Sequence, residues 1–131
     1  MKFEQLDVWK RSSRLASNVY KLMRDCQDYG FKDQITRSAL SVPSNIAEGL
    51  ERETAKEESR FLYYAKGSLG ELLTQTYIGI DIGYIDKESG LFIVAECKEI
   101  AAMIAALIKI RKGFVREEKG DYVSQTLDPR P

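Results

Sequence analysis

Apolar residues recur at intervals of three and four positions in four successive blocks of the chain. That spacing places them along one face of an α-helix, and the strict alternation that indicates a half-buried strand is weak throughout. We therefore predict an all-α fold of four amphipathic helices. They are expected to cover Leu6 to about Cys26, about Lys32 to Leu50, Thr54 to the turn at Gly83–Ile85, and Lys87 to Phe114 or Val115.

The second helix carries a proline in the middle of its apolar stripe, at position 43. A proline inside a helix has no N–H to donate, and its ring clashes with the carbonyl four residues earlier, here that of Ala39. We therefore predict a bend or step near Ala39–Pro43. Gly49, close to the end of this helix, is expected to adopt a left-handed capping conformation.

Capping residues mark the starts of the third and fourth helices. Thr54 and Glu57 have the spacing of a capping box, and Asp86 is a suitable N-cap. Short connections between long helices imply antiparallel neighbours, and the near-heptad stripe of the third helix is typical of helices packed almost parallel. The predicted architecture is an up-and-down antiparallel four-helix bundle with its second helix bent at Pro43.

The fourth helix is apolar around nearly its whole circumference between Leu91 and Ile110. Such a helix needs cover on more than one side, and in a four-helix bundle the second cover is usually another subunit. We therefore expect a homo-oligomer. Small residues that would admit a second backbone occur in the third and fourth helices: Gly67, Gly70, Gly79, Ala101, Ala102, Ala105 and Ala106.

The length of 131 residues suits a single hydrophobic core. We assign residues 1–116 to the four-helix bundle. Residues 117–131 are polar, contain Gly and Pro and lack a helical period, so we expect them to form a flexible C-terminal tail.

Net charge and the lack of targeting signals limit the partners and the cellular compartment that we expect for this chain. Twenty basic and twenty acidic residues cancel to a formal net charge of zero, so no global field draws the molecule to nucleic acid or to an anionic membrane. The N-terminus lacks the apolar core of a signal peptide, and the longest apolar run, Ile100–Ile108, is too short to span a bilayer. We expect a cytoplasmic protein without membrane contact. Cys26 and Cys97 lack CxxC spacing and are expected to be buried free thiols.

The residue types of common active sites are missing or isolated. The chain has no histidine, which excludes His-dependent triads, HExxH zinc sites and the ExxH pairs of di-iron bundles. A glutamate cluster at the start of the third helix is where solvent and the helix dipole favour negative charge: Glu51, Glu53, Glu57 and Glu58. We predict a protein that is not an enzyme and has no cofactor or metal. A carboxylate-based metal binder or enzyme is an alternative.

Basic residues form two local clusters. One interleaves with the glutamates and suits exposed ion pairs within helices: Arg37, Arg52, Lys56 and Arg60. The other lies at the end of the fourth helix and is a candidate partner surface: Lys109, Arg111, Lys112 and Arg116. Repeated around a ring, the second cluster would form a basic collar able to touch phosphates.

The stretch Gln34–Gly49, with the sequence QITRSALSVPSNIAEG, resembles the signature of the bacterial four-helix-bundle family named after intervening sequences in large-subunit ribosomal RNA genes. Further pieces similar to that family are Leu6–Trp9, Arg60–Leu72 and Gly83–Ile85. The resemblance covers roughly residues 3–115. It implies a cytoplasmic four-helix bundle whose relatives form homopentameric, barrel-like rings, and it supplies no enzyme activity. A similar bundle is the accessory variability protein of retroelements, where a basic pentamer binds a reverse transcriptase and nucleic acid.

Four polar residues of this signature are candidate partner or interface residues: Arg37, Ser41, Asn45 and Glu48. Arg37 and Glu48 are too far apart to pair within one helix, so each is expected to reach another helix or subunit. A buried polar network that fixes the bend is the first interpretation, and a binding surface is the second.

Together, residues and resemblance suggest a homo-oligomeric scaffold, a homopentamer by resemblance, that binds RNA, single-stranded nucleic acid or an RNA-associated protein. A protein–protein interaction module with no nucleic-acid role is the alternative.

Overall fold

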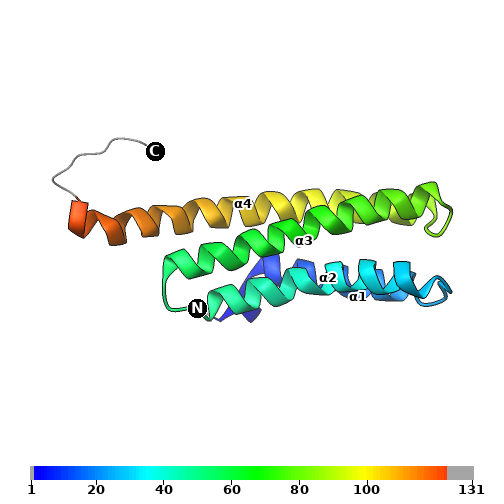
Figure 1. Ribbon diagram of the computed structural model, residues 1–131, viewed down its shortest axis with the longest axis horizontal. Coiled ribbons are helices and arrows are strands. Elements are labelled where there is room, and N and C mark those ends of the chain that lie inside the picture. The colour runs from blue at the N-terminus through cyan, green and yellow to red at the C-terminus, as the bar shows by residue number, and fades with distance from the viewer. Residues whose placement is uncertain (1, 124–131) are drawn as a thin grey trace.

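The computed structural model describes the backbone of residues 2–123 and the side chains of residues 2–113. The regular elements of this part are all helical: η1 (Phe3–Gln5), α1 (Asp7–Leu22), α2 (Tyr29–Leu50), α3 (Ala55–Asp81) and α4 (Lys87–Val123). Figure 1 shows the four α-helices aligned along one long axis, with consecutive helices running in opposite directions. Each helix packs on its neighbours in the chain, and α1 returns to contact α4. The predicted up-and-down four-helix bundle is confirmed.

All four helices contribute to one continuous core. Large apolar side chains with no accessible surface come from α1 and the turn after it, α2, α3 and α4: Val19, Met23, Ile35, Ile46, Leu62, Leu72, Ile100 and Ile104. Their three- and four-residue spacing is the pattern that predicted the helices. No described helix has a stretch of the length and apolarity that a bilayer-spanning segment requires.

Side-chain caps fix three helix starts. Thr54 Oγ1 accepts a hydrogen bond from Glu57 N at 3.2 Å, and Asp86 Oδ2 accepts one from Ser89 N at 2.9 Å, as predicted. Asp28 Oδ1 accepts one from Phe31 N at 3.1 Å, and this cap was missed. Because of it, α2 begins at Tyr29 and not near Lys32, as the sequence had suggested.

The predicted bend at Pro43 is not confirmed, because α2 runs as one α-helix from Tyr29 to Leu50. Val42 and Ile46 anchor it in the core on both sides of the buried proline. Tertiary packing of this kind outweighs the helix-breaking preference of proline. The predicted left-handed cap at Gly49 is wrong, since the described glycine with a positive φ is Gly83, at 80°.

Two other predicted helix ends are also wrong. The first helix ends at Leu22, before Cys26, and the fourth continues past Phe114 and Val115 to Val123. In Figure 1 the last turns of α4 project beyond the start of α3. The predicted tail, residues 117–131, therefore begins within this helix, and residues 124–131 lie outside the described part of the chain.

Candidate functional site

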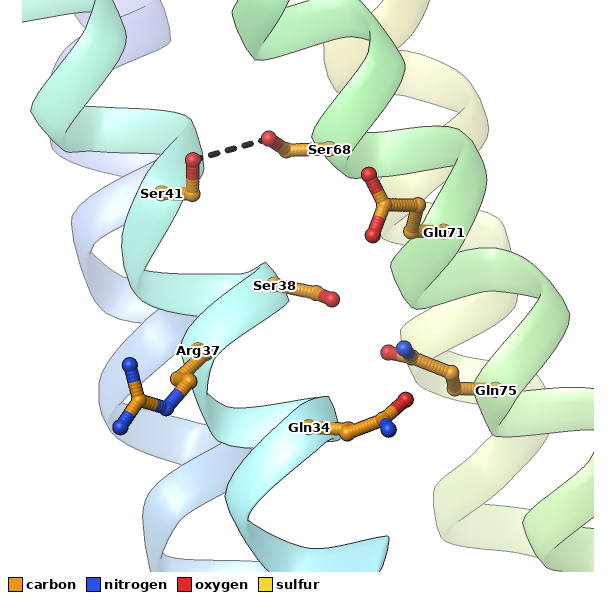
Figure 2. A pocket seen from close by; sticks show the side chains of 7 residues that line it. All are labelled: Gln34, Arg37, Ser38, Ser41, Ser68, Glu71 and Gln75. Carbon is orange, nitrogen blue, oxygen red and sulfur yellow. Dashed lines mark hydrogen bonds between the residues drawn. The ribbon is translucent and has the colours of Figure 1, made fainter.

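A polar groove of about 310 Å³ lies between α2 and α3, beside the signature segment. Figure 2 shows the side chains that line it: Gln34, Arg37, Ser38, Ser41, Ser68, Glu71 and Gln75. On α2, Gln34, Ser38 and Ser41 follow steps of four and three, which place them along one edge of the helix. The groove therefore results from a polar stripe that runs next to the apolar one.

A hydrogen-bonded network closes one end of the groove. Ser68 Oγ donates to Ser41 Oγ at 2.9 Å, as Figure 2 shows. Asn45 Nδ2 donates to the Ser41 carbonyl at 2.9 Å and to Ser41 Oγ at 2.8 Å. Two of the four predicted signature residues thus meet in a partly buried network that joins α2 to α3. Ser68 is a member that the sequence did not reveal, because helix packing alone brings it there.

Arg37 and Glu48 do not join this network. Arg37 Nε lies 2.9 Å from Asp33 Oδ2, and Glu48 pairs with Arg52. Both pairs have the i,i+4 spacing and are largely exposed, and Figure 2 shows the Arg37 side chain directed away from α3. The expectation that each would reach another helix is wrong for the protomer, and the interpretation of a single buried network holds only for Ser41 and Asn45.

The basic cluster on α4 is divided among different roles. Arg111 Nε forms an ion pair at 2.8 Å with Glu58 Oε2, and both side chains are mostly buried. Lys112 Nζ lies 5.3 Å from the centroid of the Tyr63 ring, a cation–π contact. Lys109 is exposed, and the side chain of Arg116 lies outside the described residues. Arg111 therefore ties α4 to the start of α3, and Lys109 and Lys112 carry the accessible charge of this cluster.

The chemistry of the groove is hydrogen bonding. Gln75 Oε1 is buried without a hydrogen-bond partner among the described residues, and the only carboxylate in the lining belongs to exposed Glu71. In the part of the chain that the structure describes, no three Cys, Asp or Glu side chains are placed to hold a metal ion. The arrangement offers donors and acceptors for a polar partner.

The two cysteines are free thiols with different exposure. Cys97 is buried in the core, as predicted, and burial raises its pKa to about 12. A thiol of that pKa is unreactive near neutral pH. Cys26 is only partly buried, and its Sγ lies 3.8 Å from the Asp28 carbonyl.

Comparisons with known proteins identify a solved structure of similar fold and a protein family that matches this chain. A solved structure described as a protein of unknown function from the S23 ribosomal protein family of Bacteroides thetaiotaomicron is similar, with a TM-score of 0.74 and 24% sequence identity. The match covers 78% of this chain and 98% of that one, and at this identity it supports the fold alone. No curated protein matches the chain. A scan against protein families matches residues 4–106 to the 23S rRNA-intervening sequence protein family. The chain belongs to that family.

Proposed function

We propose that this protein is a non-enzymatic homo-oligomeric scaffold that binds a macromolecular partner. The ring of five subunits implied by the resemblance is the proposed assembly. RNA or an RNA-associated protein is the proposed partner class, which agrees with the name of the family.

The observation that carries the proposal is the exposed apolar and aromatic surface on α3 and α4. Leu91, Phe92 and Ile110 of α4 are 44%, 58% and 54% exposed. On α3, exposed large apolar and aromatic side chains add to this surface: Tyr63, Tyr64, Tyr77 and Ile78. Large exposed apolar side chains on adjacent helices are groups that a protein–protein interface would cover.

Two glycines of α3 support the same conclusion. A Cβ added at Gly67 or Gly70 would meet no atom within 4 Å, so nothing in the described chain uses the space. Each glycine costs about 1 kcal/mol of helix stability relative to alanine. They lie between Tyr63 and Tyr77 at steps of four, three and seven, on one exposed face. A second helix packed on that face would use the room that they leave.

The fourth helix offers a matching surface of small residues. Ala102 and Ala106 are exposed, whereas Ala101 and Ala105 are half-buried toward the bundle. The structure thus separates the four alanines into two that a neighbour could contact and two that the protomer already covers.

Light scattering on the intact protein and on a variant with Gly67→Leu and Gly70→Leu tests the assembly. The wild type is expected to have the mass of an oligomer at micromolar concentration. Both positions are exposed, so leucine side chains there would occupy the space that a second helix needs. The mass should fall to that of one chain while circular dichroism stays helical.

A control variant with Ser17→Leu and Ser44→Leu places the same two leucine side chains at exposed positions on α1 and α2 and should keep its mass. A monomeric wild type would contradict the assembly. Dissociation of the control alone would place the interface on α1 and α2.

A further inference from the structure

The outer face of α1 carries a row of positive charges that the net charge of zero conceals. Lys10, Arg14, Lys21 and Arg24 are all exposed and, with Ser17 between them, follow steps of four, three, four and three. That spacing places them on one face over about 20 Å of α1 and the turn after it. We call these four residues the α1 basic stripe.

Within the described residues, no member of the stripe is held in an ion pair. Among the described residues, the arginines that form ion pairs are Arg11, Arg37, Arg52 and Arg111, each with a carboxylate oxygen within 2.9 Å. Arg11, next to Lys10, contacts Glu96 and Glu99 on α4 and therefore lies off the stripe.

Helix stability does not account for the stripe. Positive charge is favourable near the C-terminus of a helix, which suits Lys21 and Arg24. Lys10 lies in the first turn of α1, where the dipole opposes a cation. Lys10 and Arg14 are also like charges at i,i+4, an arrangement that weakens a helix. The helix dipole and i,i+4 spacing therefore do not explain the cations at Lys10 and Arg14.

A groove of about 470 Å³ runs beside the stripe, between α1 and α2. Its lining combines a ring, aliphatic side chains and hydroxyls: Ser13, Ala16, Ser17, Tyr20, Lys21, Leu40 and Pro43. Tyr20 and Leu40 are 45% and 48% exposed, so a flat apolar group could lie against them. Lys21 belongs to both the groove and the stripe.

We propose that the α1 basic stripe binds the phosphates of a single-stranded nucleic acid, with a base placed in the neighbouring groove against Tyr20. A row of cations that follows the backbone, beside an aromatic surface on which a base stacks, is the usual arrangement for single strands. This inference rests on the proposed function for its RNA partner class but uses a different surface from the α4 cluster and from the assembly face.

Fluorescence anisotropy with a labelled oligouridine of about 12 nucleotides tests the stripe, since single-strand sites cover a similar length. The test variant replaces all four cations with glutamine: Lys10→Gln, Arg14→Gln, Lys21→Gln and Arg24→Gln. Its affinity at low salt should fall at least tenfold. The slope of log affinity against log salt should become shallower by about 3, because four phosphate contacts on a single strand each contribute about 0.7.

The control makes the same change in net charge at exposed lysines of α3 and α4: Lys56→Gln, Lys66→Gln, Lys87→Gln and Lys98→Gln. It should keep most of the affinity and the slope. Equal losses in both variants would mean that net charge, and not the stripe, governs binding, and would overturn the inference. Light scattering on each variant measures its oligomeric mass, so that a loss of RNA affinity can be distinguished from a loss of assembly.

The groove has its own readout. Tyr20→Leu should lower affinity about tenfold without changing the salt slope, because stacking involves no counterion release, and Tyr20→Phe should restore it. Equal affinities of Tyr20→Leu and Tyr20→Phe would show that no base stacks on Tyr20 in the groove.

Three outcomes decide the rest. If the wild type binds no oligouridine at low ionic strength, both this inference and the direct RNA-binding part of the proposed function fail. If the wild type and the stripe variant bind equally well, the stripe alone fails. If polyglutamate of equal charge displaces the RNA as effectively as unlabelled oligouridine, the stripe is a site for acidic polypeptide and the nucleic-acid assignment is overturned.

Discussion

Arg11 shows how much one side chain does to hold α1 in place. Its Nη2 atom lies 2.6 Å from Glu96 Oε2 and 2.8 Å from Glu99 Oε2, so one guanidinium bridges α1 to two carboxylates of α4. The hydrogen bond from Arg11 lowers the pKa of Glu99. A carboxylate whose pKa is lowered in the folded state stabilises the fold above its ordinary pKa and loses that contribution as pH falls.

Arg11→Gln should therefore make the protein less stable near pH 7, and the difference from the wild type should narrow as pH falls through the folded pKa of Glu99. Thermal unfolding followed by circular dichroism between pH 7 and pH 3 measures this gap. Arg37→Gln, which removes an exposed pair within α2, is the control and should change stability little. A gap that stays constant with pH would show that Arg11 acts through packing alone.

Asp28 joins the two loops at one end of the bundle. The hydrogen bond from Phe31 N lowers its pKa, and the Tyr84 hydroxyl, which donates to Oδ2 at 2.8 Å, lowers it further. Because the folded pKa is lowered, this carboxylate stabilises the fold above its ordinary pKa and loses that contribution in acid.

Tyr84→Phe removes the smaller of these two causes. The pKa of Asp28 should rise but stay below its ordinary value, because the amide of Phe31 still donates. Carboxyl-carbon NMR titration measures the change. Asp86, whose pKa is lowered mainly by the amide of Ser89, is an internal control that should not move. An unchanged pKa at Asp28 would mean that the Tyr84 bond does not persist in solution.

At the scale of the elements, the sequence predicted what depends on local pattern. Helix faces follow from the apolar period, and the caps at Thr54 and Asp86 follow from residues three positions apart. The errors arose where packing decides. Pro43 stays inside a continuous helix because its neighbours are buried. Gly49 also lies within α2, and its lack of a side chain serves close packing and not a cap, since an added Cβ would lie 3.0 Å from Phe61 Cβ and 3.2 Å from Glu58 O.

Replacing two helical glycines by alanine should change the free energy of unfolding in opposite directions. At Gly90 a new Cβ would lie 2.5 Å from Ile80 Cγ1, whereas at Gly67 it would meet nothing within 4 Å. In the dissociated protomer, Gly90→Ala should cost roughly 1–3 kcal/mol by overpacking, and Gly67→Ala should add up to about 1 kcal/mol through helix propensity. Urea unfolding of both variants measures this contrast. Two changes of the same sign would show that the environment of Gly67 differs from open space.

At the scale of the whole molecule, the candidate sites were only partly predictable. The signature indicated Ser41 and Asn45, but Ser68 and Gln75 come from a helix that only folding brings beside them. The α4 basic residues are close together in the sequence, but in the structure Arg111 pairs with Glu58 and so does not contribute to the accessible charge of the cluster. The net charge did not predict the α1 basic stripe, because a net charge of zero gives the sum of the charges and not their distribution over the surface.

The position of α1 has a consequence for motion. It is the shortest of the four α-helices, its contact with α4 is the least extensive between any two that touch, and its own outer charges repel one another. Segments with few tertiary contacts open locally before the rest of a fold does. We expect α1 to be the first helix to detach in the free protein. A bound anion that reduces the repulsion between its positive charges should stabilise the packed position of this helix. Ligand occupancy and the rigidity of this helix would then rise together.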